Sequence, residues 1–264
     1  MLTPLFQHVP ARLPLLIDVP HAGTYLPDAL RSRLSAAALA LPDTDWHVEK
    51  LYAFAAELGC GLFWATHSRY VVDLNRSPDG AALYPGADNT ELYPLRTFDS
   101  QPIYQPGQEP SPDECAARLG TYFRPYHQAL AAELEALRAR HGYVVLLDGH
   151  SIRAQVPRFF AGRLPDLNLG TADGKSCAQS VSDAAWQALG ADPRFSRICN
   201  GRFKGGYVTR HYGRPQDAIH TLQLEMAQSC YLDEDTPQQL DPLRAEPLRQ
   251  VLRGLVQALL SVKP

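Results

Sequence analysis

Short runs of apolar residues, each ending at polar side chains, recur along the chain. Five of them are predicted to form strands: 13–20, 61–66, 69–74, 143–148 and 220–224. Continuous apolar runs of this length are typical of strands that are buried on both faces, as in parallel sheets. The last run alternates instead, so its polar side chains share one face and its leucines the other. The pattern therefore indicates a central, largely buried sheet.

Outside these predicted strands, apolar residues recur at the spacing of an α-helix. This spacing predicts helices over 27–39, 46–58, 111–140, 175–189 and 241–262. Pro125 is expected to kink or divide the longest of them, because proline lacks the backbone N–H that a helix interior needs. Residues 158–161 are predicted to add a strand, while 165–171 and 200–215 are predicted to be loops. Strands and helices in this arrangement indicate an α/β protein.

The composition fits a single domain over residues 1–264. With 264 residues and 45% hydrophobic content, the chain can bury a sizeable core. A formal net charge of −3 without a Lys or Arg run argues against a nucleic-acid partner. No stretch approaches the roughly 20 apolar residues of a membrane span, and the N-terminus lacks a signal-peptide pattern, so we expect a cytoplasmic protein without a membrane partner. The five scattered cysteines are expected to be reduced thiols.

Three predicted strands end at side chains that bind metals or move protons. His21 directly follows the first strand, His150 lies just past the strand that ends at Asp148, and Glu225 closes the last one. Gly149 is expected to turn the chain before His150. Because ligands gather at the carboxyl ends of parallel strands, these side chains are expected to meet. Two imidazoles and a carboxylate suit a zinc-type site with an open position, and a further carboxylate can act as base.

The start of the predicted helix 46–58 is unusually acidic and offers another ligand. Asp43 and Asp45 precede its first turn, and Glu49 lies four residues beyond Asp45. One interpretation is helix capping and complementarity to the helix dipole. The other is that Asp45 completes a metal site with the two histidines. His47 and Glu49 lie within one helical turn of Asp45 and are the alternative ligands.

Cationic side chains occupy two further places where a ligand can bind. Arg76 follows the predicted strand 69–74, so it also lies at a strand exit. Residues 200–215 are dense in glycine, cations and hydroxyls, and Lys204 and Arg210 there can pair with carboxylates. Residues 81–111 show little periodicity. Since loops of this length are often functional, we expect a wall or lid over the site.

Six motifs occur in order along nearly the whole chain. They are VPHAG (19–23), DTDWH (43–47), SRYVVDLNR (68–76), DGHS (148–151), KGGYVT (204–209) and LQLE (222–225). In this combination the sequence resembles the N-formylglutamate amidohydrolase family, also called N-formylglutamate deformylase, of bacterial histidine degradation. The resemblance implies a three-layer sandwich similar to zinc carboxypeptidases and other phosphorylase/hydrolase-like folds. In it, helices flank a mixed, mostly parallel sheet that carries one metal at its strand ends.

The resemblance also implies a reaction: hydrolysis of N-formyl-L-glutamate to formate and L-glutamate, the last step of a histidine degradation route. His21, Asp45 and His150 would hold one divalent ion, zinc by preference, although Co²⁺, Fe²⁺ or Mn²⁺ suit the same ligands. Glu225 would move the proton and Arg76 would stabilise the oxyanion or hold a carboxylate. The implied substrate-binding residues are Arg76, Lys204, Thr209 and Arg210.

Two other functions fit the same residues. One is a zinc amidase that acts on a different N-acyl amino acid or a small peptide. The other is a metal-dependent binding protein in which Glu225 is structural. A serine hydrolase is disfavoured because the sequence has no G-x-S-x-G motif, and it also lacks the H-E-x-x-H helix of common metallopeptidases. No apolar stripe or heptad predicts an oligomeric state.

Overall fold

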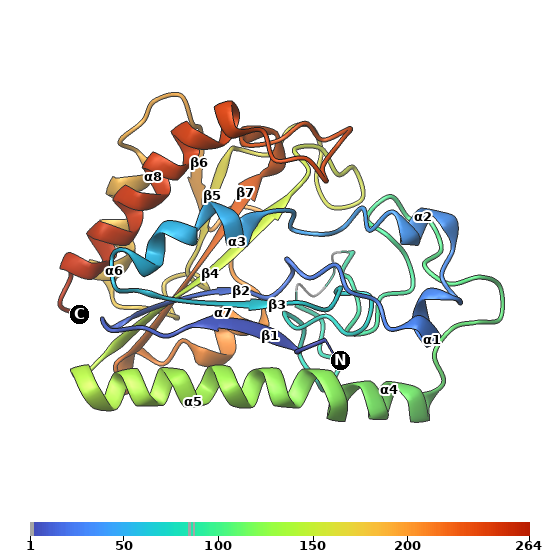
Figure 1. Cartoon of the computed structure of the whole chain (residues 1–264). Helices are drawn as coiled ribbons and strands as arrows, with labels where there is room; N and C mark the ends of the chain where they lie inside the picture. The colour runs from blue at the N-terminus through green and yellow to red at the C-terminus, as the bar shows by residue number, and fades with distance from the viewer. Residues whose placement is uncertain (1–2, 84–85, 87) are drawn as a thin grey trace.

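A seven-stranded sheet forms the centre of the molecule, with helices on both faces (Figure 1). The computed structural model describes residues 3–83, 86 and 88–264. The strand order is β1-β3-β2-β4-β7-β5-β6. The strands are β1 (Phe6–Val9), β2 (Leu15–Val19), β3 (Gly61–Ala65), β4 (Val144–Ile152), β5 (Leu167–Gly170), β6 (Arg197–Cys199) and β7 (Ile219–Ala227).

The middle of the sheet is parallel. Strands β3, β2, β4 and β7 run side by side in one direction, whereas β1 is antiparallel to β3 and β5 is antiparallel to β7. The two longest strands, β4 and β7, are buried along their whole length, which accounts for the continuous apolar run that begins β4. The prediction of a mixed, mostly parallel sheet flanked by helices is confirmed. The comparison with zinc carboxypeptidases stays a prediction.

Two helical layers cover the sheet (Figure 1). On one face lie α3 (Val48–Leu51), α6 (Gln179–Leu189) and α8 (Pro242–Ser261), whose apolar residues share one core cluster with the sheet. On the other face lie α5 (Arg124–His141) and α7 (Tyr207–Tyr212), which form a second cluster with it. The remaining helical elements are α1 (Asp28–Arg31), α2 (Ala36–Leu39), η1 (Ala53–Ala56), α4 (Pro112–Arg118), η2 (Leu119–Phe123), η3 (Pro215–Asp217) and η4 (Gln228–Cys230).

Several predicted helices are divided in the structure. The segment 111–140 begins where the Ser111 hydroxyl accepts the Glu114 N–H, and it passes from α4 through the single π-helical turn η2 into α5. Pro125 stands in the first turn of α5, so the predicted division occurs just before it. The segment 27–39 forms the separate helices α1 and α2, and 46–58 forms α3 and η1. The last helix, α8, matches its prediction within one residue at each end.

The prediction of a strand over 69–74 is wrong. Its apolar residues Tyr70 and Val71 instead join a separate cluster with α1 and α2. The Asp73 carboxylate accepts the Asn75 N–H at 2.9 Å, a local bond by which aspartate stabilises turns. The apolar composition of this segment therefore reflects burial beside the sheet rather than membership of it.

Three shorter predictions along the chain are also wrong. Residues 158–161 form a turn, because the N–H groups of Phe159 and Phe160 both donate to the Val156 carbonyl. Residues 165–171 contain strand β5, which pairs with β7 and β6, and 200–215 contain helix α7. For β5 and α7 the pairing or packing partners are distant in the sequence, so local composition did not reveal them.

Gly149 does not turn the chain, contrary to the prediction. Strand β4 continues through His150 to Ile152. A Cβ at position 149 would lie 2.9 Å from the Tyr52 ring, so the glycine allows that buried ring to approach the strand. His150 is thus held within the sheet rather than on a flexible turn.

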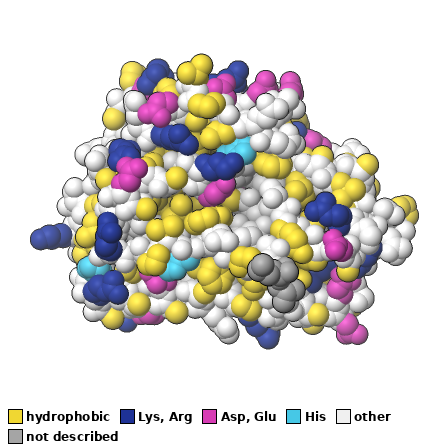
Figure 2. All heavy atoms as spheres, in the orientation of Figure 1, with side chains coloured by type: hydrophobic (Ala, Val, Ile, Leu, Met, Phe, Trp, Pro, Cys, Tyr) yellow, Lys and Arg dark blue, Asp and Glu magenta, His cyan; other side chains and the backbone are white. Residues whose placement is uncertain are grey.

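Charged side chains of both signs are interspersed over the face shown in Figure 2. No extended region of that face carries Lys and Arg alone, in line with the formal net charge of −3. Within the part of the chain that the structure describes, no helix combines the length and the apolar character needed to cross a membrane.

Candidate metal centre and active site

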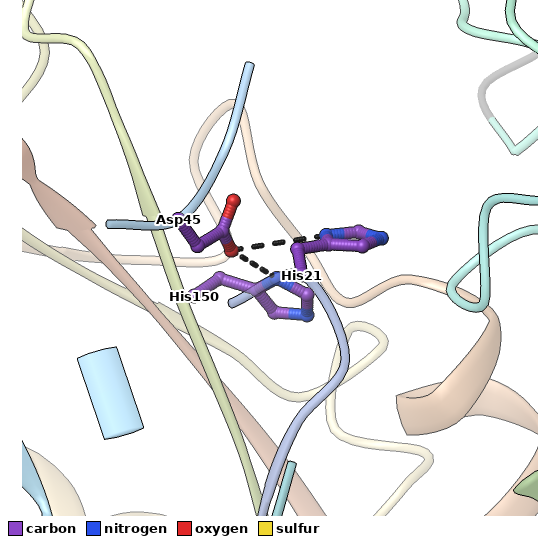
Figure 3. A group of neighbouring side chains, drawn as sticks. All are labelled: His21, Asp45 and His150. Carbon is purple, nitrogen blue, oxygen red and sulfur yellow. Dashed lines mark hydrogen bonds and ion pairs between the residues drawn. The ribbon is translucent and has the colours of Figure 1, made fainter. Parts of the chain in front are cut away.

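Three buried side chains from distant parts of the sequence converge at one end of the parallel strands (Figure 3). His21 comes just after β2, Asp45 from the loop before α3, and His150 from β4. Their possible ligand atoms all lie within 4.8 Å of one another. The Asp45 N–H also donates to the His21 carbonyl at 3.1 Å, which ties the Asp45 loop to the end of β2. The structure therefore brings together all three predicted metal ligands.

Both histidines turn the same ring nitrogen toward Asp45. Its Oδ2 lies 2.8 Å from His150 Nδ1 and 3.7 Å from His21 Nδ1 (Figure 3). The Ser151 N–H donates to the same oxygen at 3.1 Å. Two imidazole nitrogens and a carboxylate oxygen face one another, which is the donor set of a three-ligand metal site with an open position.

The outward nitrogens of both rings meet carboxylates. His21 Nε2 lies 2.7 Å from Asp73 Oδ1, and His150 Nε2 lies 2.8 Å from both Asp148 Oδ1 and the amide nitrogen of Asn75, with which it forms a hydrogen bond. Histidines that bind metals almost always hold a carboxylate, carbonyl or water with the second nitrogen, since this fixes the ring and its tautomer. The residues around the group therefore fit a divalent cation.

Electrostatics at this site favour a positive charge. Burial would raise the pKa of Asp73, but Arg69, then His21 and Arg76, outweigh it and hold that pKa well below its usual range. For His150, burial lowers the pKa, yet Asp148 and Asp45 raise it well above the ordinary value. The carboxylates thus dominate the field at the His150 imidazole, as a cation site requires.

The alternative ligands lie outside this group. Among the described residues, neither His47 nor Glu49 belongs to it. His47 Nδ1 lies 3.0 Å from Lys50 Nζ, and the His47 backbone is left-handed, with φ of 63°. Of the three candidate ligands around this helix start, Asp45 is the one whose side chain groups with both histidines. That it binds the metal stays a prediction.

Glu225 lies beside His150 on the neighbouring strand, in direct register with it. It does not close its strand as predicted, because β7 continues to Ala227. Its side chain lines the same cleft as the three ligands and is 8% exposed. Burial, opposed by His150 and aided by Asp45, raises the pKa of Glu225 to about 8. A carboxyl group of this kind can both accept and return a proton near neutral pH.

The cleft above the metal ligands is lined mainly by strand ends and loops. Besides His21, Asp45, His150 and Glu225, the lining residues are Arg69, Asn75, Arg76, Leu83, Asn89, Thr90, Phe98, Ser151, Ile152, Phe159, Arg202, Phe203, Gly206 and Gln223. Four of them come from the segment 81–111, which therefore contributes a wall, as predicted. Residues 84, 85 and 87 of that segment lie outside the described residues, and movement as a lid stays a prediction.

The four predicted substrate contacts lie in different places. Arg76 lines the cleft and donates through Nε to the Thr90 carbonyl at 3.0 Å. Thr209 is buried under the metal group, where its hydroxyl donates to Asp148 Oδ2 at 3.2 Å. Lys204 pairs with Asp173 at 3.0 Å, and Arg210 donates to the Gly205 carbonyl. Neither Lys204 nor Arg210 is among the described cleft-lining residues, and their contact with substrate stays a prediction.

Sequence reasoning missed several residues that support the site. Arg69 holds Asp73 at 2.6 Å and lies 3.7 Å from Asp45, and Asn75 lies 2.8 Å from His150 Nε2. Both belong to the 68–76 motif, which had contributed only Arg76 to the predicted site. Asp148 belongs to the same motif as His150, so the motif could also have indicated that it supports the site. Arg202 follows β6 without a motif, so its place in the cleft could not be inferred from the sequence.

The comparisons with known proteins agree with this geometry. The family described as N-formylglutamate amidohydrolase matches residues 13–232. The N-formylglutamate deformylases of Pseudomonas putida and Pseudomonas aeruginosa are each 47% identical to this chain over 250 residues. The match covers 95% of this chain and 93% or 94% of theirs.

Solved structures show the same fold. The N-formylglutamate amidohydrolase from Ralstonia eutropha JMP134 superposes with a TM-score of 0.79 at 28% identity, covering 97% of this chain and 96% of that one. A gene product from Agrobacterium tumefaciens superposes with a TM-score of 0.71 at 20% identity over 98% and 95% of the two chains, and supports the fold alone. On the family match and the 47% identity, this chain belongs to the N-formylglutamate amidohydrolase family.

Proposed function

We propose that this chain hydrolyses N-formyl-L-glutamate to formate and L-glutamate with one divalent metal ion, zinc by preference. The observation that carries the proposal is a cleft in which a buried His-Asp-His group lies beside a carboxyl group with a raised pKa. The relatives named N-formylglutamate deformylase, 47% identical over nearly their whole length, support the choice of substrate. The reaction would be the last step of a histidine degradation route.

His21, Asp45 and His150 would hold the ion, and Asp73 and Asp148 would fix the two imidazole rings. A bound divalent ion lowers the pKa of water and polarises a carbonyl oxygen. Two histidines and a carboxylate suit zinc, while cobalt, iron or manganese can occupy the same donors, with availability deciding among them.

Glu225 would be the group that moves the proton. It is not part of the three-residue metal group, yet it lines the same cleft in register with His150. It would accept the proton of the attacking water and deliver it to the departing amine nitrogen, so that L-glutamate leaves as a neutral or protonated amine rather than an anion. Burial raises the pKa of Glu225, which makes its carboxylate a stronger base than an exposed one.

Arg76 would hold negative charge near the reacting carbon. Its positive charge is among those that lower the pKa of Asp73, so it lies near the His21 side of the metal group. From there it would stabilise the oxygen anion that develops on the formyl group or hold the α-carboxylate of the substrate. Either role requires a fixed guanidinium, which the bonds to Thr90 and to the Asn75 carbonyl provide.

Release of the free amine tests the proposed substrate directly, because hydrolysis of each of the three amides below liberates an amine, whereas only the formyl compound yields formate. Purified protein would be assayed with N-formyl-L-glutamate, N-acetyl-L-aspartate and a cell-wall amide at equal concentration. We expect kcat/KM to be highest for N-formyl-L-glutamate. A higher value for either other compound would assign the chain to a different amidase activity, and binding without turnover of any of them would make it a binding protein.

A further inference from the structure

The cleft has an arginine that the proposed mechanism does not use. Arg202 lines the cleft and is half-buried. Its Nε donates to the Phe159 carbonyl at 2.8 Å, and its guanidinium carbon lies 5.8 Å and 5.4 Å from the ring centres of Phe159 and Phe203. Both rings also line the cleft. The aromatic walls and the backbone bond together hold a positive charge in one place.

The surroundings of Arg202 differ from those of the metal group. Asp88 is held by Arg158 through two bonds, of 3.0 Å and 2.9 Å. That bonding to Arg158 is the main cause that lowers the pKa of Asp88, and the charges of Arg96 and Arg202 add to it. Arg202 therefore lies close enough to the Asp88–Arg158 pair for its charge to act on Asp88, which is not itself among the described cleft-lining residues. Arg76, by contrast, acts on Asp73 beside His21.

The proposed substrate has a shape that matches two separated cations. Its side-chain carboxylate lies two carbons farther from the formyl group than its α-carboxylate does. With the formyl carbon at the metal group, the nearer carboxylate would reach Arg76 and the farther one would extend along the cleft. A fixed, planar guanidinium there can bind a carboxylate through two parallel hydrogen bonds.

We propose that Arg202 binds the side-chain carboxylate of the substrate and so selects N-formyl derivatives of acidic amino acids. The inference rests on the proposed deformylase function and names the residue that recognises the side chain of the substrate's amino acid. It assigns to Arg202 the role that the sequence had offered to Lys204 and Arg210, both of which lie outside the described lining of the cleft.

The test compares Arg202→Gln with wild type on two substrates, N-formyl-L-glutamate and N-formyl-L-glutamine. The second keeps the formyl group and the α-carboxylate but lacks the side-chain charge. For N-formyl-L-glutamate, kcat/KM should fall about 10- to 100-fold, mostly through KM, because a hydrogen bond between charged groups is lost. For N-formyl-L-glutamine the fall in kcat/KM should be smaller, about two- to tenfold, because Arg202 can make only a hydrogen bond to a neutral amide there. Arg202→Lys keeps the charge without the planar pair of donors and should fall between the two.

Arg194→Gln is the matched control, since Arg194 is an exposed arginine paired with Asp192 outside the cleft. This variant should have the wild-type kcat/KM for both substrates. An equal fall for both substrates in Arg202→Gln would overturn the proposal, because Arg202 would then act on the shared part of the substrate or on the fold. So would no fall for either. Failure of wild type to release formate from either substrate would instead reject the deformylase function itself.

Discussion

Two parts of the cleft lining, the metal group and Arg202, differ in the elements that hold their side chains. In the metal group, His21, Asp45 and His150 come from strands or from loops tied to strands, and each is no more than 3% exposed. Every ring nitrogen there has a carboxylate within 3.7 Å. Arg202, by contrast, comes from a loop, is half-buried, and is held by two aromatic rings and one carbonyl.

The difference matches the two tasks of a hydrolase. Bond cleavage depends on distances held within fractions of an ångström. A buried sheet can maintain such distances when each side chain has polar partners on two sides. Recognition of a carboxylate tolerates more adjustment and suits a loop. Substitutions in the metal group and its partners should therefore lower turnover, whereas substitution of Arg202 should change the preferred substrate. The predictions below probe that contrast, from the largest expected effect to the smallest.

Asp45→Ala should cause the largest loss. It removes the carboxylate that faces both histidines, so bound zinc should be nearly absent and formate release should fall about 1000-fold or more, beyond the 10- to 100-fold typical of an outer partner. Glu49→Ala is the matched control and should keep wild-type metal content. Metal analysis of both purified variants decides the ligand. Full occupancy in Asp45→Ala with loss in Glu49→Ala would reverse the assignment.

Glu225→Gln should lower kcat by about 100- to 10,000-fold, the usual range for removal of a general base. Because Glu225 is not in the metal group, zinc content and KM should stay near wild type. Steady-state kinetics together with metal analysis separates the two effects. If zinc is lost along with activity, Glu225 is a ligand rather than the group that moves the proton.

Asp73→Asn should weaken metal binding about 10- to 100-fold while leaving saturated activity closer to wild type. Asp73 holds His21 at 2.7 Å and Arg69 at 2.6 Å, so the amide would leave the imidazole less fixed. The measurement is competition for zinc with a chelator of known affinity. Asp183→Asn, at an exposed position on α6, is the control. Equal zinc affinity in Asp73→Asn and wild type would show that Asp73 does not position His21.

Thr209→Val should have the smallest effect and would separate a supporting role from substrate binding. Its hydroxyl bonds to Asp148, and loss of one buried hydrogen bond should lower the free energy of unfolding by about 1 kcal/mol. Chemical denaturation measures that change, and KM should stay within about twofold of wild type. If the free energy of unfolding is unchanged and KM rises strongly, Thr209 binds the substrate, as was predicted from its motif.

The sequence predicted the residues of the site better than it predicted the strands and turns around them. His21, Asp45 and His150 could be found because each stands next to a strongly patterned segment. The strand over 69–74 could not be ruled out, because the apolar side chains that pack on α1 and α2 have the same composition as a strand. The continuation of β4 past Gly149 depends on its pairing with β7, which lies far along the chain at Ile219–Ala227. Arg202 reaches the cleft only through tertiary contacts with Phe159 and Phe203.

The central claim is that this cleft deformylates N-formyl-L-glutamate with a metal held by His21, Asp45 and His150. The most direct measurement is formate release from N-formyl-L-glutamate by the purified protein, before chelation, after chelation, and after zinc is added back. We predict activity that the chelator removes and zinc restores. Undiminished activity in protein shown to contain no metal would contradict the account, and so would inactivity of protein that holds one zinc ion per chain.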